Sequence, residues 1–204
     1  VILLCVFSIF LLFNSVEQIG ESSGIENINE YLSNFAPLFI ASMLSLSCPA
    51  ASAISLEGKN IWILQSSPVK VKMILNSKIA VNLTLHLMGY MISIFAFMLK
   101  LDMNFIQVIN LIIVPICYSI FITVIGISLN KKYSNYEWES EMMVVKQSMP
   151  VIVSGLVGII ALITPIPLNW FLNLPITLVL QIISVTLLVI SSEVYIKVSK
   201  SNFI

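Results

Sequence analysis

The chain of 204 residues is 58% hydrophobic and only 10% charged. Because soluble globular domains carry about 25% charged residues, this composition excludes a soluble fold and indicates a protein that places its apolar side chains in a lipid bilayer. Ten lysines, with no arginine, balance ten acidic residues, so no basic face is expected to bind nucleic acid.

The first apolar run, residues 1–13, falls short of the about 20 residues that a helix needs to cross hydrocarbon. A secretory signal peptide would require a basic start and a cleavage site of small residues, and the sequence from Asn14 to Glu17 provides no such site. We therefore interpret the run as a truncated span and expect the chain to be a fragment of a longer protein. The polar and acidic residues 14–33 predict a solvated loop.

Further apolar segments approach spanning length at residues 34–54, 79–99, 105–129, 149–165 and 174–196. They are continuously apolar and do not alternate, and hydrocarbon requires every backbone group to be bonded internally, so helices are predicted in preference to strands. The expected fold is an all-α, polytopic transmembrane bundle of about six spans, the first truncated, in a single domain over residues 1–204.

The lysines predict how this bundle is oriented. They gather in the connection 55–78, in the loop 130–148 and in the tail after residue 196, whereas the loop 14–33 holds four glutamates and no lysine. Short cytoplasmic loops carry an excess of lysine. The sequence therefore predicts a multi-pass protein of the cell membrane with the three lysine-bearing segments and the C-terminus in the cytoplasm, and with 14–33 outside.

The connection 55–78 differs from an ordinary loop because it is apolar and contains helix signals. Ser55 can cap a helix, with Glu57 in the favourable first turn. Trp62 supplies a bulky apolar side suited to the membrane interface. Pro68 can begin a second helix that continues into the next span. On these grounds an amphipathic helix that only anchors the bundle is as consistent with the residues as one that binds a partner.

The same connection carries, in order, Glu57, Gly58, Lys59, Trp62, Leu64, Pro68 and Lys78. This pattern resembles the segment after the second span in type-2 ABC exporter permeases, where the segment forms the coupling helix docked on the ATPase. The resemblance implies that these residues contact a separate ABC ATPase. It also implies that the chain forms part of a translocation path with a second permease half, which is either the missing upstream part or another copy.

A second stretch is similar to the cytoplasmic loop of bacterial putative ABC exporters, and its residues are Trp138, Glu141 and Lys146. The resemblance implies a second ATPase contact, although a solvated acidic loop explains the same glutamates. No histidine or aspartate stands nearby to complete a cation site, and the cysteines Cys5, Cys48 and Cys117 show no metal-binding spacing, so no metal is expected.

Motifs for catalysis are missing from the sequence. No G-x-x-x-x-G-K-[ST] occurs, so any ATP must be hydrolysed by a partner. His86, the only histidine, lacks a partner His, Glu or Asp at similar depth, and we expect a packed or helix-bridging residue and not a proton relay. The sequence thus predicts no enzyme and no cofactor.

The last outer connection contains Pro165, Pro167 and Trp170 without any charge. The simple interpretation is a proline-rich turn anchored by Trp170 in the outer interface. Type-2 ABC exporters have short re-entrant helices between their last two spans, so the resemblance implies an outer gate here. An exporter permease is the leading hypothesis. The alternatives are a non-transporting scaffold or assembly factor that recruits a soluble partner and, third, a membrane-embedded enzyme.

Overall fold

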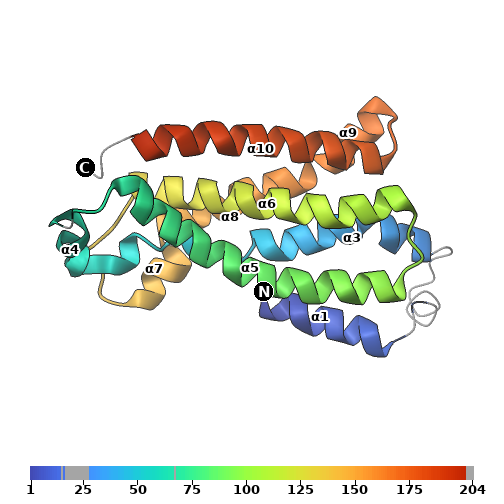
Figure 1. Ribbon diagram of the computed structural model, residues 1–204, viewed down its shortest axis with the longest axis horizontal. Helices are drawn as coiled ribbons and strands as arrows, with labels where there is room; N and C mark the ends of the chain where they lie inside the picture. The colour runs from blue at the N-terminus through green and yellow to red at the C-terminus, as the bar shows by residue number, and fades with distance from the viewer. Residues whose placement is uncertain (15, 17–27, 67, 201–204) are drawn as a thin grey trace.

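The computed structural model describes residues 1–14, 16, 28–66 and 68–200 (Figure 1). These residues form helices and no strand, which confirms the predicted all-α class. Five helical segments of the described part are long and apolar enough to cross a membrane: Ile28–Leu64, Val71–Lys100, Phe105–Lys132, Glu141–Leu172 and Ile176–Lys200. With the shorter apolar helix Ile2–Phe13, they form the helical bundle of a multi-pass membrane protein.

Long helices carry this bundle and short elements connect them. The long helices are α1 (Ile2–Phe13), α3 (Ile28–Ser45), α5 (Val71–Lys100), α6 (Phe105–Lys132), α8 (Met149–Ile163) and α10 (Ile176–Lys200). The short elements are the 3-10 helices η1 (Pro49–Ala51) and η2 (Ser55–Asn60) and the α-helices α4 (Ile61–Ser66), α7 (Glu141–Gln147) and α9 (Pro165–Leu172).

Helix α6 is the centre of the bundle, with α3, α5, α8 and α10 packed around it. Most of its residues are apolar and many are buried, as expected of a helix surrounded by others, and Tyr118 in its middle is fully buried. Because lipid tails are as apolar as the side chains, helices in a bilayer associate through close packing and interhelical hydrogen bonds. Tyr118 donates to the carbonyl of Ala161 in α8 (2.9 Å), and Asn110 donates to the carbonyl of Thr177 in α10 (3.0 Å).

The ends of the bundle follow the lysine pattern. Figure 1 shows α4, α7 and the C-terminal end of α10 together at one end, and the α5–α6 turn and α9 at the other. The segments 55–78 and 130–148 and the end of α10 therefore share one end, which we call the lysine-bearing end. Its cytoplasmic location remains a prediction.

The predicted span 34–54 is interrupted. Helix α3 ends at Ser45, and an irregular stretch with the short helix η1 follows inside the bundle. Pro49 contributes to the break, because proline disfavours the helical conformation in the preceding residue, and Cys48 has φ −117° and ψ 79°. The apolar composition of 34–54 concealed this change of conformation.

The helix starts predicted in the connection 55–78 are wrong. Ser55 caps no helix. Its hydroxyl instead accepts hydrogen bonds from the side chain of Asn130 in α6 and from the backbone of Asn135 in the loop beyond α6. Pro68 begins no helix either, because it lies in a bend, Lys70 is extended, and α5 begins at Val71. The amphipathic helix around Trp62 is a 3-10 turn followed by the six residues of α4.

Candidate functional site

The two segments that the sequence assigned to a partner contact meet at the lysine-bearing end. The indole nitrogen of Trp138 donates to the carbonyl of Ser55 (2.8 Å), and its ring covers Gly58, where an added Cβ would lie 3.0 Å from the ring. Gly58 has φ +53°, a conformation that suits glycine. We call Ser55–Ser66, Trp138 and α7 the end platform.

Asn130 at the end of α6 holds the end platform to α6 by hydrogen bonds. Its side-chain oxygen accepts from the backbone N–H groups of Ile54 (2.6 Å) and Ser55 (3.1 Å), and its nitrogen donates to the Ser55 hydroxyl (2.8 Å). The side chain is completely buried, so loss of these bonds would leave unpaired polar groups at a cost of about 1–3 kcal/mol. Asn130 was not among the residues predicted to form a site, and the one signal for it in the sequence is an amide beside two lysines at the end of an apolar span.

An ion pair fastens the platform to α5. The carboxylate of Glu57 binds the ammonium group of Lys78, and both side chains are about one-quarter exposed (28% and 25%). Partly exposed pairs of this kind add about 0–1 kcal/mol of stability. The main effect of the pair is therefore to fix the position of η2 against the first turns of α5, and its contribution to stability is small. Glu57 and Lys78 thus satisfy each other within the chain.

The platform exposes large apolar side chains together with charged ones of both signs. Trp62 is 62% exposed, and Met142 of α7 is 65% exposed. Lys59, Pro68, Glu141 and Lys146 are also exposed, whereas Leu64 is half-buried. Large exposed apolar patches mark contacts with protein or membrane, and Trp62 and Met142 are the side chains of the platform that suit such a contact.

The residues proposed for an outer gate lie apart at the opposite end. The segment is the helix α9 and not a turn. Pro165 is buried and Pro167 is exposed, and Trp170 is 83% exposed. None of the three lines the cavity described below.

Halfway along the bundle, polar side chains of α5 and α6 hold the irregular stretch after α3. The ring nitrogens of His86 bind the Ser119 hydroxyl (2.7 Å) and the carbonyl of Ser47. The expectation that His86 bridges helices is confirmed. Asn82 accepts from the backbone N–H of Ala50 (3.2 Å) and donates to Thr123 (2.6 Å). Irregular backbone survives at membrane depth only when protein groups satisfy it, and these side chains do so.

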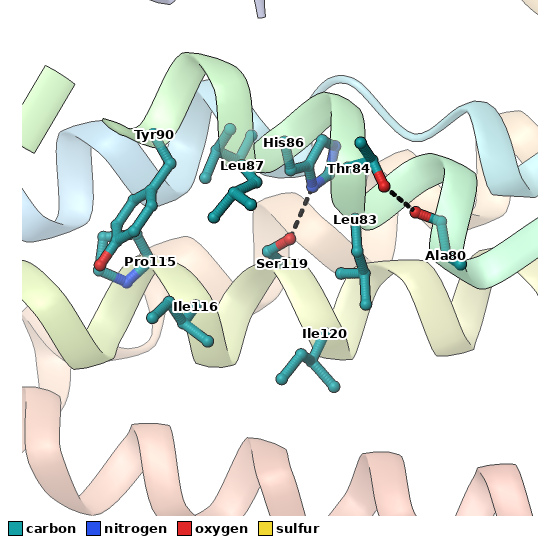
Figure 2. Close-up of a pocket in the computed structure, with 11 residues that line it drawn as sticks. Ala80, Leu83, Thr84, His86, Leu87, Tyr90, Pro115, Ile116, Ser119 and Ile120 are labelled. Carbon is teal, nitrogen blue, oxygen red and sulfur yellow. Dashed lines mark hydrogen bonds between the residues drawn. The ribbon is translucent and has the colours of Figure 1, made fainter. Parts of the chain in front are cut away.

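A cavity of about 440 Å³ lies beside this network, between α5 and α6. Figure 2 shows Leu83, Leu87 and Ile116 on its walls, with the bonded pair His86 and Ser119 between the two helices. Elsewhere in the described residues, no group of three or more His, Cys, Asp or Glu side chains could hold a metal ion.

No family model, curated protein or solved structure matches the chain. Membership of the type-2 ABC exporter permeases therefore stays a prediction from the residue pattern. The end platform and the cavity are the two candidate sites, and what they do is inferred from their own geometry.

Proposed function

We propose that the chain is the membrane-spanning permease subunit of an ATP-driven exporter of the cell membrane, and that a separate ABC ATPase docks on the end platform. The observation that supports the proposal is the contact between Trp138 and Gly58. Each of the two segments resembles the exporter pattern by itself, and this contact brings them side by side. The end platform exposes Trp62 at its outer side.

The attachments of the platform suit the transmission of a movement. Glu57 ties it to α5 through Lys78, and Asn130 ties it to α6. A partner that displaces η2 would therefore displace both helices. Rigid-body movement of helices is a common way to switch a path between inward and outward access. The second permease half would complete the path, and the C-terminus would lie in the cytoplasm with the platform.

Co-purification tests the proposal. The tagged chain is expressed in its native cells, extracted in mild detergent, and its partners are identified by mass spectrometry. We expect an ATPase that carries G-x-x-x-x-G-K-[ST], and we expect Lys59→Glu to remove it. Lys59 is exposed, so the reversed charge should disturb docking and leave the fold intact. Lys200→Glu, an exposed site on α10, is the matched control and should retain the ATPase.

The scaffold hypothesis predicts a different result. A soluble partner without that motif, lost in the same variant, would favour a recruiting scaffold, because the exposed surface of Trp62 and Met142 fits either partner. An ATPase that binds but supports no ATP-dependent flux in vesicles would favour it as well. An ATPase that co-purifies equally with Lys59→Glu would place the docking surface elsewhere.

A further inference from the structure

The cavity between α5 and α6 lies at mid-depth of the membrane-spanning part. The midpoints of Val71–Lys100 and Phe105–Lys132 fall beside His86 and Ser119, which both line it. A 30-residue helix is about 45 Å long, and the hydrocarbon core is about 30 Å thick. The cavity is therefore surrounded by the apolar part of a bilayer.

Short side chains of α5 and α6 leave room for the cavity. Figure 2 places Ala80 and Thr84 of α5 toward the end of the cavity where Ile120 lies, Pro115 of α6 beside Tyr90 at the other end, and Ser119 between them. Pro115 lacks the N–H that would continue the helix, and Tyr90 donates to the nearby carbonyl of Ile112 (2.8 Å). The two helices are thus held together at a place where their side chains do not fill the space between them.

The cavity opens sideways. Ala80, Thr84 and Leu87 on its rim are exposed. The neighbouring outward residues of α5 are apolar as well, with Val81 60% and Met88 62% exposed. The opening is therefore continuous with the surface that this membrane protein presents to lipid.

The polar side chains of the cavity wall already make hydrogen bonds within the protein, so they do not require a polar ligand. His86 is bonded through both ring nitrogens, one of them to Ser119. Thr84 donates to the carbonyl of Ala80 (2.7 Å), and Tyr90 is bonded as described. The surface left for a ligand is hydrocarbon, which selects an apolar occupant.

The size of the cavity distinguishes between two possible apolar occupants, a helix and a single hydrocarbon chain. The distance from Ala80 to Tyr90 along α5 is about 15 Å. Over that length a helix with its side chains, about 10–12 Å wide, would take up more than about 1,000 Å³, which is well above the cavity volume of about 440 Å³. A single extended hydrocarbon chain, one row of methylene groups, is narrow enough.

We propose that this cavity is a binding slot for one acyl chain of a membrane amphiphile, which enters sideways from the bilayer. The volume lies within the range of about 300–1,000 Å³ typical of ligand pockets. The proposal concerns binding alone and holds whether or not an ATPase docks on the platform.

Photolabelling tests the slot. The purified chain is reconstituted in phosphatidylcholine vesicles that contain a small fraction of phosphatidylcholine with a diazirine at mid-chain, and labelled residues are mapped by mass spectrometry after irradiation. We expect labelling of Leu83, Ile116 and Ile120 that saturates as the probe fraction rises. Labelling of Val81, which faces bulk lipid, should rise in proportion to the probe.

Filling the slot provides the decisive comparison. Ala80→Phe should abolish labelling inside the slot, and Thr84→Phe at the exposed rim should do the same if the first variant folds poorly. Val81→Phe adds the same ring on the outward side and should leave slot labelling unchanged. Non-saturating labelling that is equal inside and outside the slot, or insensitive to both fillers, would overturn the proposal. A slot that stays unlabelled while Val81 is labelled would overturn it as well and indicate a covering protein segment.

Discussion

A glycine and an indole ring fix the shape of the end platform at the scale of single residues. Gly58 has φ +53° and ψ −135° inside η2, and Trp138 closes over the space where a side chain would stand. The two residues lie far apart in the sequence, so their contact becomes visible only in the folded chain. Gly58 is thus required for both its backbone conformation and its missing side chain.

Gly58→Ala should loosen the platform. Forcing alanine into this backbone conformation costs about 1–3 kcal/mol, and the new methyl group would push Trp138 away from Ser55. Amide hydrogen exchange of residues 54–66 should become faster than in the unaltered protein.

Gly155→Ala is the matched control for this substitution. Gly155 lies in α8 with no atom within 4 Å of an added Cβ, so alanine there should be neutral or stabilise by up to about 1 kcal/mol. Unchanged exchange in both variants would contradict the role assigned to Gly58.

The interrupted span is the main feature at the scale of elements. Helix α3 stops at Ser45, and side chains from α5 and α6 take over the backbone groups that a continuous helix would have bonded itself. Broken helices of this kind often lie beside binding sites in transport proteins. The break here lies next to the proposed acyl-chain slot, because His86 contacts the irregular stretch and also lines the cavity.

Asn82→Leu should destabilise this break. The substitution leaves the backbone N–H of Ala50 without its partner, at a cost of about 1–3 kcal/mol for a buried unpaired group. The hydroxyl of Thr123 loses the bond from Asn82 and keeps its own bond to the carbonyl of Ser119 (2.6 Å). The unfolding temperature in detergent should fall. Thr84→Val is the control, because exposed Thr84 bonds only a carbonyl of its own helix, and it should change the unfolding temperature little. Equal effects of the two variants would show that Asn82 does not hold the break.

The contrast between α6 and α3 shows what the sequence could predict about the elements. A span is predicted over residues 105–129, and α6 is there a continuous helix long and apolar enough to cross a membrane. A continuous apolar run leaves the backbone no other way to be satisfied in lipid. The segment that contains the run 34–54 is also apolar enough to cross a membrane, although its mean hydropathy (1.6) is below that of α6 (2.5), and the second half of the run is irregular. The side chains that bond the irregular backbone, Asn82 and His86, belong to α5. The sequence of residues 34–54 therefore gives no sign of these bonds.

The candidate sites show the same limit. The pattern around Trp62 and around Trp138 indicated two contact segments, but the hydrogen bond and ring contact that join them depend on the fold. The slot between α5 and α6 left no mark in the sequence, because alanine, threonine and serine on a membrane helix are common where helices pack closely.

Topology governs every functional inference at the scale of the whole molecule. The lysine-bearing segments share one end of the bundle (Figure 1), and short lysine-rich loops favour the cytoplasm. Only a platform inside the cell can meet an ATPase. The acyl-chain slot does not depend on which end of the bundle faces the cytoplasm, since hydrocarbon is present at mid-depth in either orientation.

The orientation can be measured with single cysteines in a variant that has Cys5, Cys48 and Cys117 replaced by alanine. Asn60→Cys reports the platform and Trp170→Cys reports the opposite end, and both side chains are exposed. With a membrane-impermeant maleimide added to intact cells, we expect Trp170→Cys to react at once and Asn60→Cys to react only after permeabilisation. The reverse pattern would place the platform outside the cell and end the ATPase proposal, while the acyl-chain slot would still have to be judged by its own labelling.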